Sequence, residues 1–87
     1  MDRKTITLRR PVKVDGVETD NLTLRTTVTV NDNLLAAEGG GSQARMEVRL
    51  IANLLEIPET SVCEMDVRDY NAIKMELVDF LTGPGGE

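Results

Sequence analysis

The amino-acid sequence predicts an α+β fold, in which an N-terminal antiparallel β-hairpin (a small sheet) precedes two main amphipathic helices and shorter helical segments. Apolar and polar residues alternate near the N-terminus, helical spacing replaces this alternation after about residue 30, and Asp15-Gly16 is a hairpin turn signal. The 87 residues are enough for one domain. We expect a single domain over 1–81 (1–30 β, 31–81 α) and a disordered tail over 82–87.

The two hairpin strands are predicted from alternation on both sides of the turn. Residues 5–9 alternate, and Pro11 should bend the first strand or place it at an edge because proline donates no backbone hydrogen bond. Counting outward from the turn places Leu24 near Thr7. We therefore expect a bulge or loop near 20–21 to adjust the register.

The first helix is expected to be short. Either Asn31 or Asp32 can cap a helix that includes residues 34–38. Three glycines at 39–41 should end it, because they cost too much backbone entropy for a helix interior. Ser42 can cap the helix that follows.

The second helix should run from about Gln43 to Glu56, with apolar positions over a wide arc. Pro58 can then occupy the first turn of a short helical segment. Asp66 and Asp69 are interpreted as a capping pair for the last helix. One face of that helix is predicted to carry Val67, Tyr70, Ile73, Leu77, Phe80 and Leu81.

The residues offer little for catalysis, so we expect no enzyme activity, no cofactor and no metal site. The sequence has no histidine and a single cysteine, Cys63, which we expect to be semi-buried. Gly39 to Ser42 fits a flexible joint better than an anion nest, since no lysine follows. Glu64, Asp66 and Asp69 do not match a calcium loop, and capping explains the two aspartates better.

Charge is divided unevenly along the chain. Residues 1–30 hold six basic and four acidic side chains, whereas residues 31–87 hold four basic and eleven acidic ones, giving the net charge of −5. This balance disfavours nucleic acid, and the basic cluster of Arg3, Lys4, Arg9, Arg10 and Lys13 fits a solvated strand face. No apolar run is long enough for a membrane span and no signal peptide is recognisable, so a cytoplasmic location is expected.

The helical faces are the remaining candidate for function. One side of the wide apolar arc can pack in the core while the other stays available to a partner or a second copy. Met75 lies off the main face of the last helix and favours such a contact. The partner-binding residues proposed from the sequence are Met46, Leu50, Leu54, Ile73, Leu77 and Phe80.

Several strings of the chain occur in an order that resembles the phage tail assembly chaperones of the E/41/14 family, from Mu-like phages and prophages. The strings cover 4–8, 11–16, 22–25, 32–38, 66–73 and 79–81. The most specific feature is their order, with Val14-Asp15-Gly16 early and Asp66 to Ala72 followed by Asp79-Phe80-Leu81 late. Val28 to Asn31 departs from the expected pattern and leaves the start of the first helix open.

This resemblance implies a chaperone that binds the phage tape-measure protein and keeps it soluble in the cytoplasm of the bacterial host. It also implies absence from the mature virion, with the tail-tube protein and a frameshifted longer form as possible further partners, and a homo-oligomer is possible. Two alternatives stay open. One is a small structural tail subunit, and the other is a ubiquitin-like carrier or adaptor domain, suggested by Gly85-Gly86 near the C-terminus.

Overall fold

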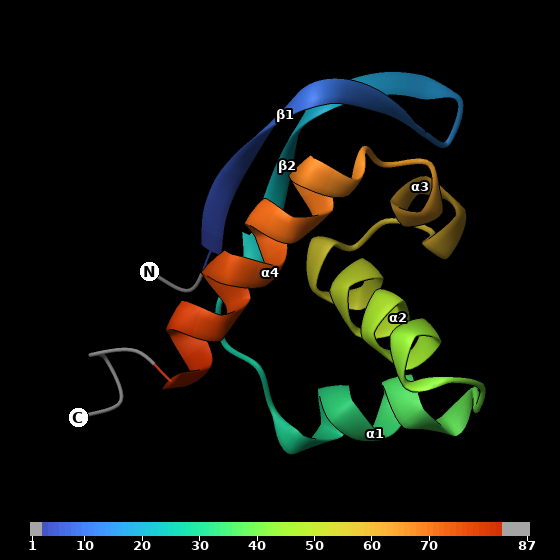
Figure 1. Cartoon of the computed structure of the whole chain (residues 1–87), viewed down its shortest axis with the longest axis vertical. Helices are drawn as coiled ribbons and strands as arrows, with labels where there is room; N and C mark the ends of the chain where they lie inside the picture. Colours follow the sequence, from blue (N-terminus) through green and yellow to red (C-terminus); the bar gives the residue numbers. More distant parts are fainter. Residues whose placement is uncertain (1–2, 83–87) are drawn as a thin grey trace.

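The structure is a computed structural model that describes residues 3–82, with side chains as far as Asp79 (Figure 1). The two strands pair as an antiparallel sheet and helices follow, which confirms the predicted α+β class. Thr82 belongs to the last helix rather than to the predicted tail, and residues 83–87 lie outside the described part. The elements are β1 (Arg3–Val14), β2 (Val17–Arg25), α1 (Val30–Glu38), α2 (Gln43–Leu55), α3 (Glu59–Cys63) and α4 (Val67–Thr82).

The hairpin turn lies where the sequence predicts it. Asp15 and Gly16 have positive φ angles of 53° and 83°, as a two-residue turn of type I′ requires. Leu24 pairs with Lys4 rather than lying near Thr7, so the register does change along the hairpin, as expected from the count outward from the turn. The next irregularity along the ladder explains this difference.

The strand ladder is interrupted in β1, and not at 20–21 as expected. Regular pairing ends at Thr7 and resumes at Val12, so the extra residues are in the first strand. Pro11 lies in this stretch and has no backbone N–H to contribute to a ladder. The prediction identified a register change correctly but assigned it to the wrong strand.

The first helix begins earlier than predicted because Thr29, and not Asn31 or Asp32, is its N-cap. The Thr29 hydroxyl accepts from the backbone N–H of Asp32 at 3.2 Å, and the Asp32 carboxylate accepts from the Thr29 N–H at 2.8 Å. This reciprocal pair is a capping box. Asp32 is therefore the third residue of α1 rather than the residue before it.

The other helix ends follow the sequence more closely. Gly40 and Gly41 have positive φ angles of 69° and 92°, and α1 stops before them, as expected for a glycine joint. Ser42 is confirmed as the N-cap of α2, since its hydroxyl accepts from the Arg45 N–H at 3.1 Å. Pro58 is the N-cap of α3, one position before the predicted first turn.

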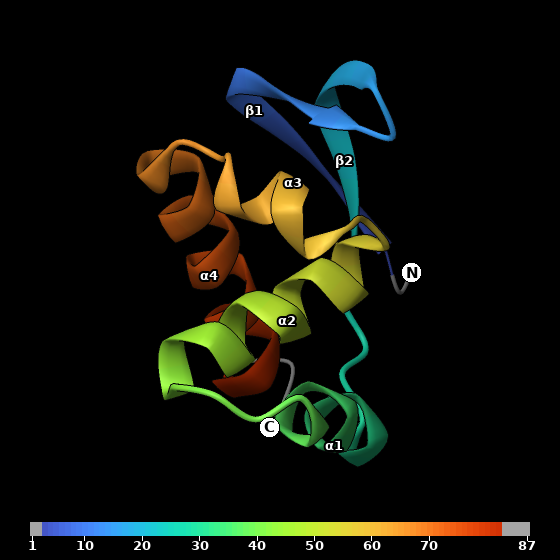
Figure 2. The same ribbon diagram turned by 90° about the vertical axis from the view of Figure 1, so that its right-hand side faces the viewer.

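The hydrophobic core lies between the hairpin and the helices, and α4 runs beneath the arch of the hairpin (Figures 1 and 2). The core cluster consists of Leu8, Val12, Leu22, Leu24, Ile51, Leu54, Leu55, Met65, Ile73 and Leu77. Two predictions are wrong here. Val67 is exposed instead of lying on the buried face of α4, and Cys63 is exposed instead of semi-buried.

Candidate functional site

Asp69 fastens α4 to the irregular part of β1. Its buried carboxylate accepts hydrogen bonds from the backbone N–H of Arg9, at 3.0 and 3.1 Å, and of Arg10, at 3.1 Å. The predicted capping role is wrong for Asp69, because its carboxylate accepts hydrogen bonds from β1 and not from α4. The capping role is correct for Asp66, whose carboxylate accepts from the Arg68 N–H at 2.8 Å. The interaction occupies donors that the interrupted ladder leaves without a strand partner.

Arginine side chains hold both ends of α1. Arg25, at the end of β2, makes two hydrogen bonds to the Asp32 carboxylate, at 3.0 and 2.9 Å. These bonds, together with the Thr29 N–H, hold the pKa of Asp32 well below its usual range. Arg49 of α2 donates to the backbone carbonyls of Ala36 and, at 3.2 Å, Gly40. Positive charge therefore lies at the C-terminal end of α1, where the helix dipole favours it.

A hollow of about 240 Å³ opens between α1 and α2, and we name it the α1–α2 groove. Its walls are mainly apolar because α1 contributes Ala36 and Ala37 and α2 contributes Met46 and Leu50. Met46 and Leu50 are only half-buried, and the flexible methionine can adapt to a partner's side chains. The complete lining is Asn33, Ala36, Ala37, Gln43, Met46, Glu47 and Leu50.

The apolar wall of α1 continues beyond the groove. At 100° per residue, Val30 and Leu34 follow Ala37 around the helix, and both are exposed. An apolar strip thus leads from the groove onto the outer side of α1. A continuous exposed apolar surface of this kind indicates a contact with another macromolecule.

Glu47 forms the polar rim of the groove and connects α2 to α4. Its carboxylate accepts a hydrogen bond from the Tyr70 hydroxyl at 3.0 Å and pairs with Lys74 at 3.3 Å. The ammonium of Lys74 also lies 5.7 Å from the centre of the Tyr70 ring. Burial, followed by the Glu47 interaction, raises the pKa of Tyr70. The rim is consequently braced by a second helix rather than free to move alone.

The structure brings together only two of the six partner-binding residues proposed from the sequence. Met46 and Leu50 line the groove, but Leu54 and Ile73 are fully buried and Leu77 is 6% exposed. These three side chains form the core and offer no surface to a partner in this conformation. The side chain of Phe80 lies outside the described part.

The sequence interpretation missed the wall supplied by α1. Ala36 and Ala37 line the groove and Leu34 extends it, yet these residues were interpreted only as a short helix. Recognising Thr29 as the N-cap would have lengthened this helix and shown that its apolar residues share a side. The missed signal was therefore a capping box, Thr29 with Asp32 three residues later.

Between residues 3 and 82, no group of three or more His, Cys, Asp or Glu side chains is arranged to hold a metal ion. No helix in the same part of the chain has the length and apolar character needed to cross a bilayer.

Taken together, a hairpin-and-helix fold with an open apolar groove defines a small α+β domain with a surface suited to another protein. Residues 5–82 match the model of the family described as phage tail assembly chaperone proteins, E, or 41 or 14. The chain therefore belongs to this family. No curated protein and no solved structure matches the chain.

Proposed function

We propose that this protein is a non-catalytic chaperone that binds the phage tape-measure protein and keeps it soluble in the host cytoplasm while the tail tube assembles. Membership of the tail assembly chaperone family supports the general role. The α1–α2 groove is the observation that supports the contact surface. In this proposal the chain leaves before the virion is complete.

The groove suits an amphipathic helix of the client. Such a helix can place its apolar side chains between Ala37 of α1 and Met46 and Leu50 of α2, in the helix-in-groove mode of recognition. Val30 and Leu34 extend the contact along the outside of α1. The contact area of one copy is small, so each copy binds weakly.

Weak binding by one copy is compatible with coating a long client. Many copies along one chain hold it by avidity, and each still dissociates readily when tube subunits compete. The net charge of −5 on each copy keeps the coated complex soluble, because like-charged particles repel one another. A shallow site therefore allows many copies to hold the client together and each single copy to dissociate readily.

Co-expression with the tape-measure protein tests the surface. The substitution Met46→Gln places an amide in the α1–α2 groove, and Leu34→Gln places one on the apolar strip of α1. Neither alters the core, and each should lower the soluble fraction of the client several-fold. Val17→Gln is the matched control, since Val17 is an exposed valine at the hairpin turn, 65% accessible. Equal client solubility with all three variants would overturn the proposed surface.

Mass spectrometry of purified particles separates the chaperone from a structural tail subunit. The proposed function predicts that peptides of this chain are absent from finished virions but present in lysates during assembly. A stoichiometric amount in particles would instead support the structural role. The ubiquitin-like alternative finds no support in the fold, since the described residues form a two-stranded sheet and a β-grasp sheet has more strands.

A further inference from the structure

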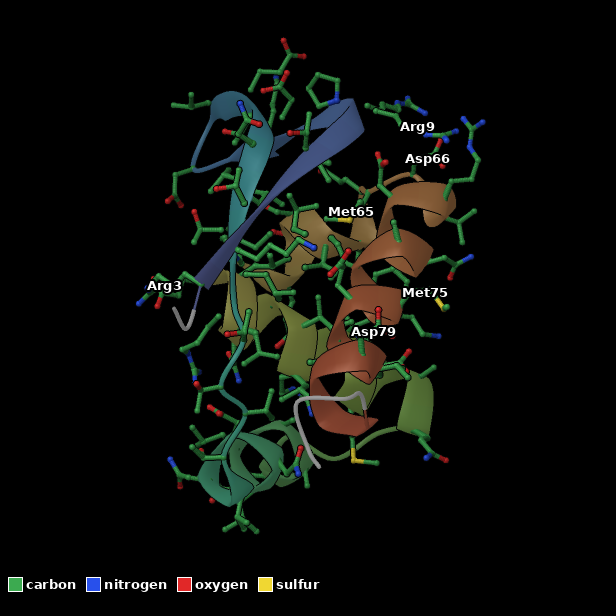
Figure 3. All side chains as sticks on the ribbon, turned by 90° about the vertical axis from the view of Figure 1, so that its left-hand side faces the viewer. Arg3, Arg9, Met65, Asp66, Met75 and Asp79 are labelled. Atoms are coloured by element: carbon green, nitrogen blue, oxygen red, sulfur yellow. The ribbon has the colours of Figure 1, made fainter. Side chains whose placement is uncertain are left out.

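Helix α4 carries a second apolar face that points away from the core. Val67, Met75 and Val78 are 67%, 64% and 48% exposed. At 100° per residue these three side chains and Asn71 fall within one narrow sector of the helix, well separated from buried Ile73. Figure 3 shows Met75 projecting from α4 away from the other helices. We name Val67, Asn71, Met75 and Val78 the outer α4 stripe.

Opposite charges lie at the two ends of one edge of this stripe. Arg68 is in the first turn of α4 and Asp79 lies about three turns later, and both are exposed on the same edge. Asp79 forms no ion pair within the described part of the chain. The Arg68 guanidinium bonds to Asp66 through two of its nitrogens, which leaves other N–H donors available.

From this arrangement, we propose that the outer α4 stripe is the contact between two copies of this chain, with the two α4 helices antiparallel about a two-fold axis. In that arrangement Val67 lies opposite Val78 of the second copy, and Asn71 lies opposite Met75 of the second copy. Arg68 then lies opposite Asp79 of the second copy, and symmetry forms this pair twice. The stripe is thus self-complementary in charge, and its two exposed valines face each other across the axis.

The second copy is favoured as occupant because the charges match only when the sequence is reversed against itself. In a parallel pairing about a two-fold axis, the edge that carries Arg68 and Asp79 faces the opposite edge of the second copy, so the two Arg68–Asp79 pairs do not form. Lys74 lies toward the other edge of the stripe, where its pairing with Glu47 at 3.3 Å compensates its charge. The α1–α2 groove lies outside this contact, so the dimer does not depend on the proposed function.

A contact through one helix face is small. Stable interfaces bury about 1,200–2,000 Å², and a single pair of helices with three apolar side chains each contributes less. The dimer is therefore a weak one that forms over the micromolar to millimolar range of protein concentration. Assembly of many copies on one client would raise the local concentration and favour it.

Sedimentation equilibrium over that concentration range tests the dimer. Arg68→Glu and Asp79→Arg each place like charges together twice, and each should weaken association about fivefold. The double variant R68E/D79R reverses the pair and should restore association to within about twofold. Val17→Gln, an exposed valine on the hairpin, should leave it unchanged.

Three outcomes would overturn this inference. They are a wild-type chain that stays monomeric at every concentration, single variants that associate as wild type does, and a double variant that fails to regain association. If the wild type is monomeric and Met75→Lys instead lowers client solubility, the stripe contacts the client and the second copy is rejected. Circular dichroism verifies folding, and the two charge substitutions are on exposed side chains, so loss of the fold is not expected.

Discussion

Asp69 illustrates how one carboxylate can stabilise both strand and helix. In the sequence it resembles a helix-capping residue, because it lies in the first turn of α4. In the fold it is buried and accepts hydrogen bonds from the backbone N–H groups of Arg9 and Arg10. These two residues lie in the stretch of β1 between Thr7 and Val12 where the ladder is interrupted. Nothing in local spacing indicates this role, since the two parts of the interaction are about sixty residues apart.

Replacing Asp69 should therefore cost far more stability than replacing its neighbour Asp66. Asp69→Ala leaves backbone donors of β1 without their buried acceptor, at a cost of about 2–4 kcal/mol of unfolding free energy. Asp66→Ala removes a half-buried cap whose ion-pair partner, Arg68, is exposed, and it should have a much smaller effect. Urea denaturation of the two variants measures the difference, and equal losses would show that the strand interaction is unimportant.

The Asp32 carboxylate makes the free energy of unfolding depend on pH in the acidic range. Its pKa in the folded state lies below the ordinary value of 3.8, mainly because Arg25 and the Thr29 N–H bond to the charged carboxylate. The stabilisation is therefore complete above about pH 4 and decreases as the pH falls further. Asp32→Asn should lower the unfolding free energy by about 1–3 kcal/mol at neutral pH.

The pH dependence of that variant provides the check. The difference in unfolding free energy between wild type and Asp32→Asn should shrink as the pH is lowered below about 4, since protonation removes the charge of Asp32 in the wild type as well. Denaturation curves measured at neutral and acidic pH would reveal this. A difference that is constant across pH would contradict the role of the charge.

Helix α1 lies outside the hydrophobic core, since none of its residues belongs to the core cluster. It has nine residues, packs mainly on α2, and is bounded by an irregular segment and a glycine joint. A helix of this length is not stable by itself in water, so its order depends on contacts at its ends. Arg25 and Arg49 supply those contacts. We expect α1 to open locally before the rest of the fold.

Arg49→Met tests the attachment of α1. The variant removes the donors to the carbonyls of Ala36 and Gly40 but keeps an apolar stem on α2. Amide hydrogen exchange in α1 should quicken about tenfold, as expected for about 1–2 kcal/mol of lost local stability, while exchange in α4 stays unchanged. Unaltered exchange in α1 would show that Arg49 does not hold it.

The elements also differ in how well the sequence predicted them. The turn at Asp15-Gly16 and the Ser42 cap depend on local chemistry, and both are confirmed. The interruption of β1 was misplaced, because it depends on Asp69 from a distant helix as well as on Pro11. The first helix was shortened because Thr29 lies in a run of β-branched residues that also favours a strand.

For the molecule as a whole, the sequence indicates that the helices carry more apolar residues than a small core needs. It does not indicate which of these residues are buried in the core and which remain at the surface. A helical wheel gives the angle of Leu54 or Leu50 but not what covers each one. In the fold Leu54 is buried between layers, while Leu50 reaches the groove beside Met46. The candidate surface therefore became visible only when the position of α1 was known.

The α1–α2 groove and the outer α4 stripe are separate surfaces of the described residues. Helix α1, which forms one wall of the α1–α2 groove, lies at the end of the molecule farthest from the hairpin turn (Figure 1), and Met75 of the outer α4 stripe projects from α4 (Figure 3). Client binding and self-association would then occur together without competing. This arrangement is what a chaperone needs if many copies are to follow one extended client.

The most direct test of the account is a nuclear magnetic resonance titration of the isotope-labelled chain with an amphipathic helical peptide from the tape-measure protein. We predict that chemical-shift changes concentrate on Ala36, Ala37, Met46 and Leu50 in the groove, and that Met46→Gln weakens binding several-fold. Unshifted groove residues, or changes confined to the hairpin, would contradict the central claim.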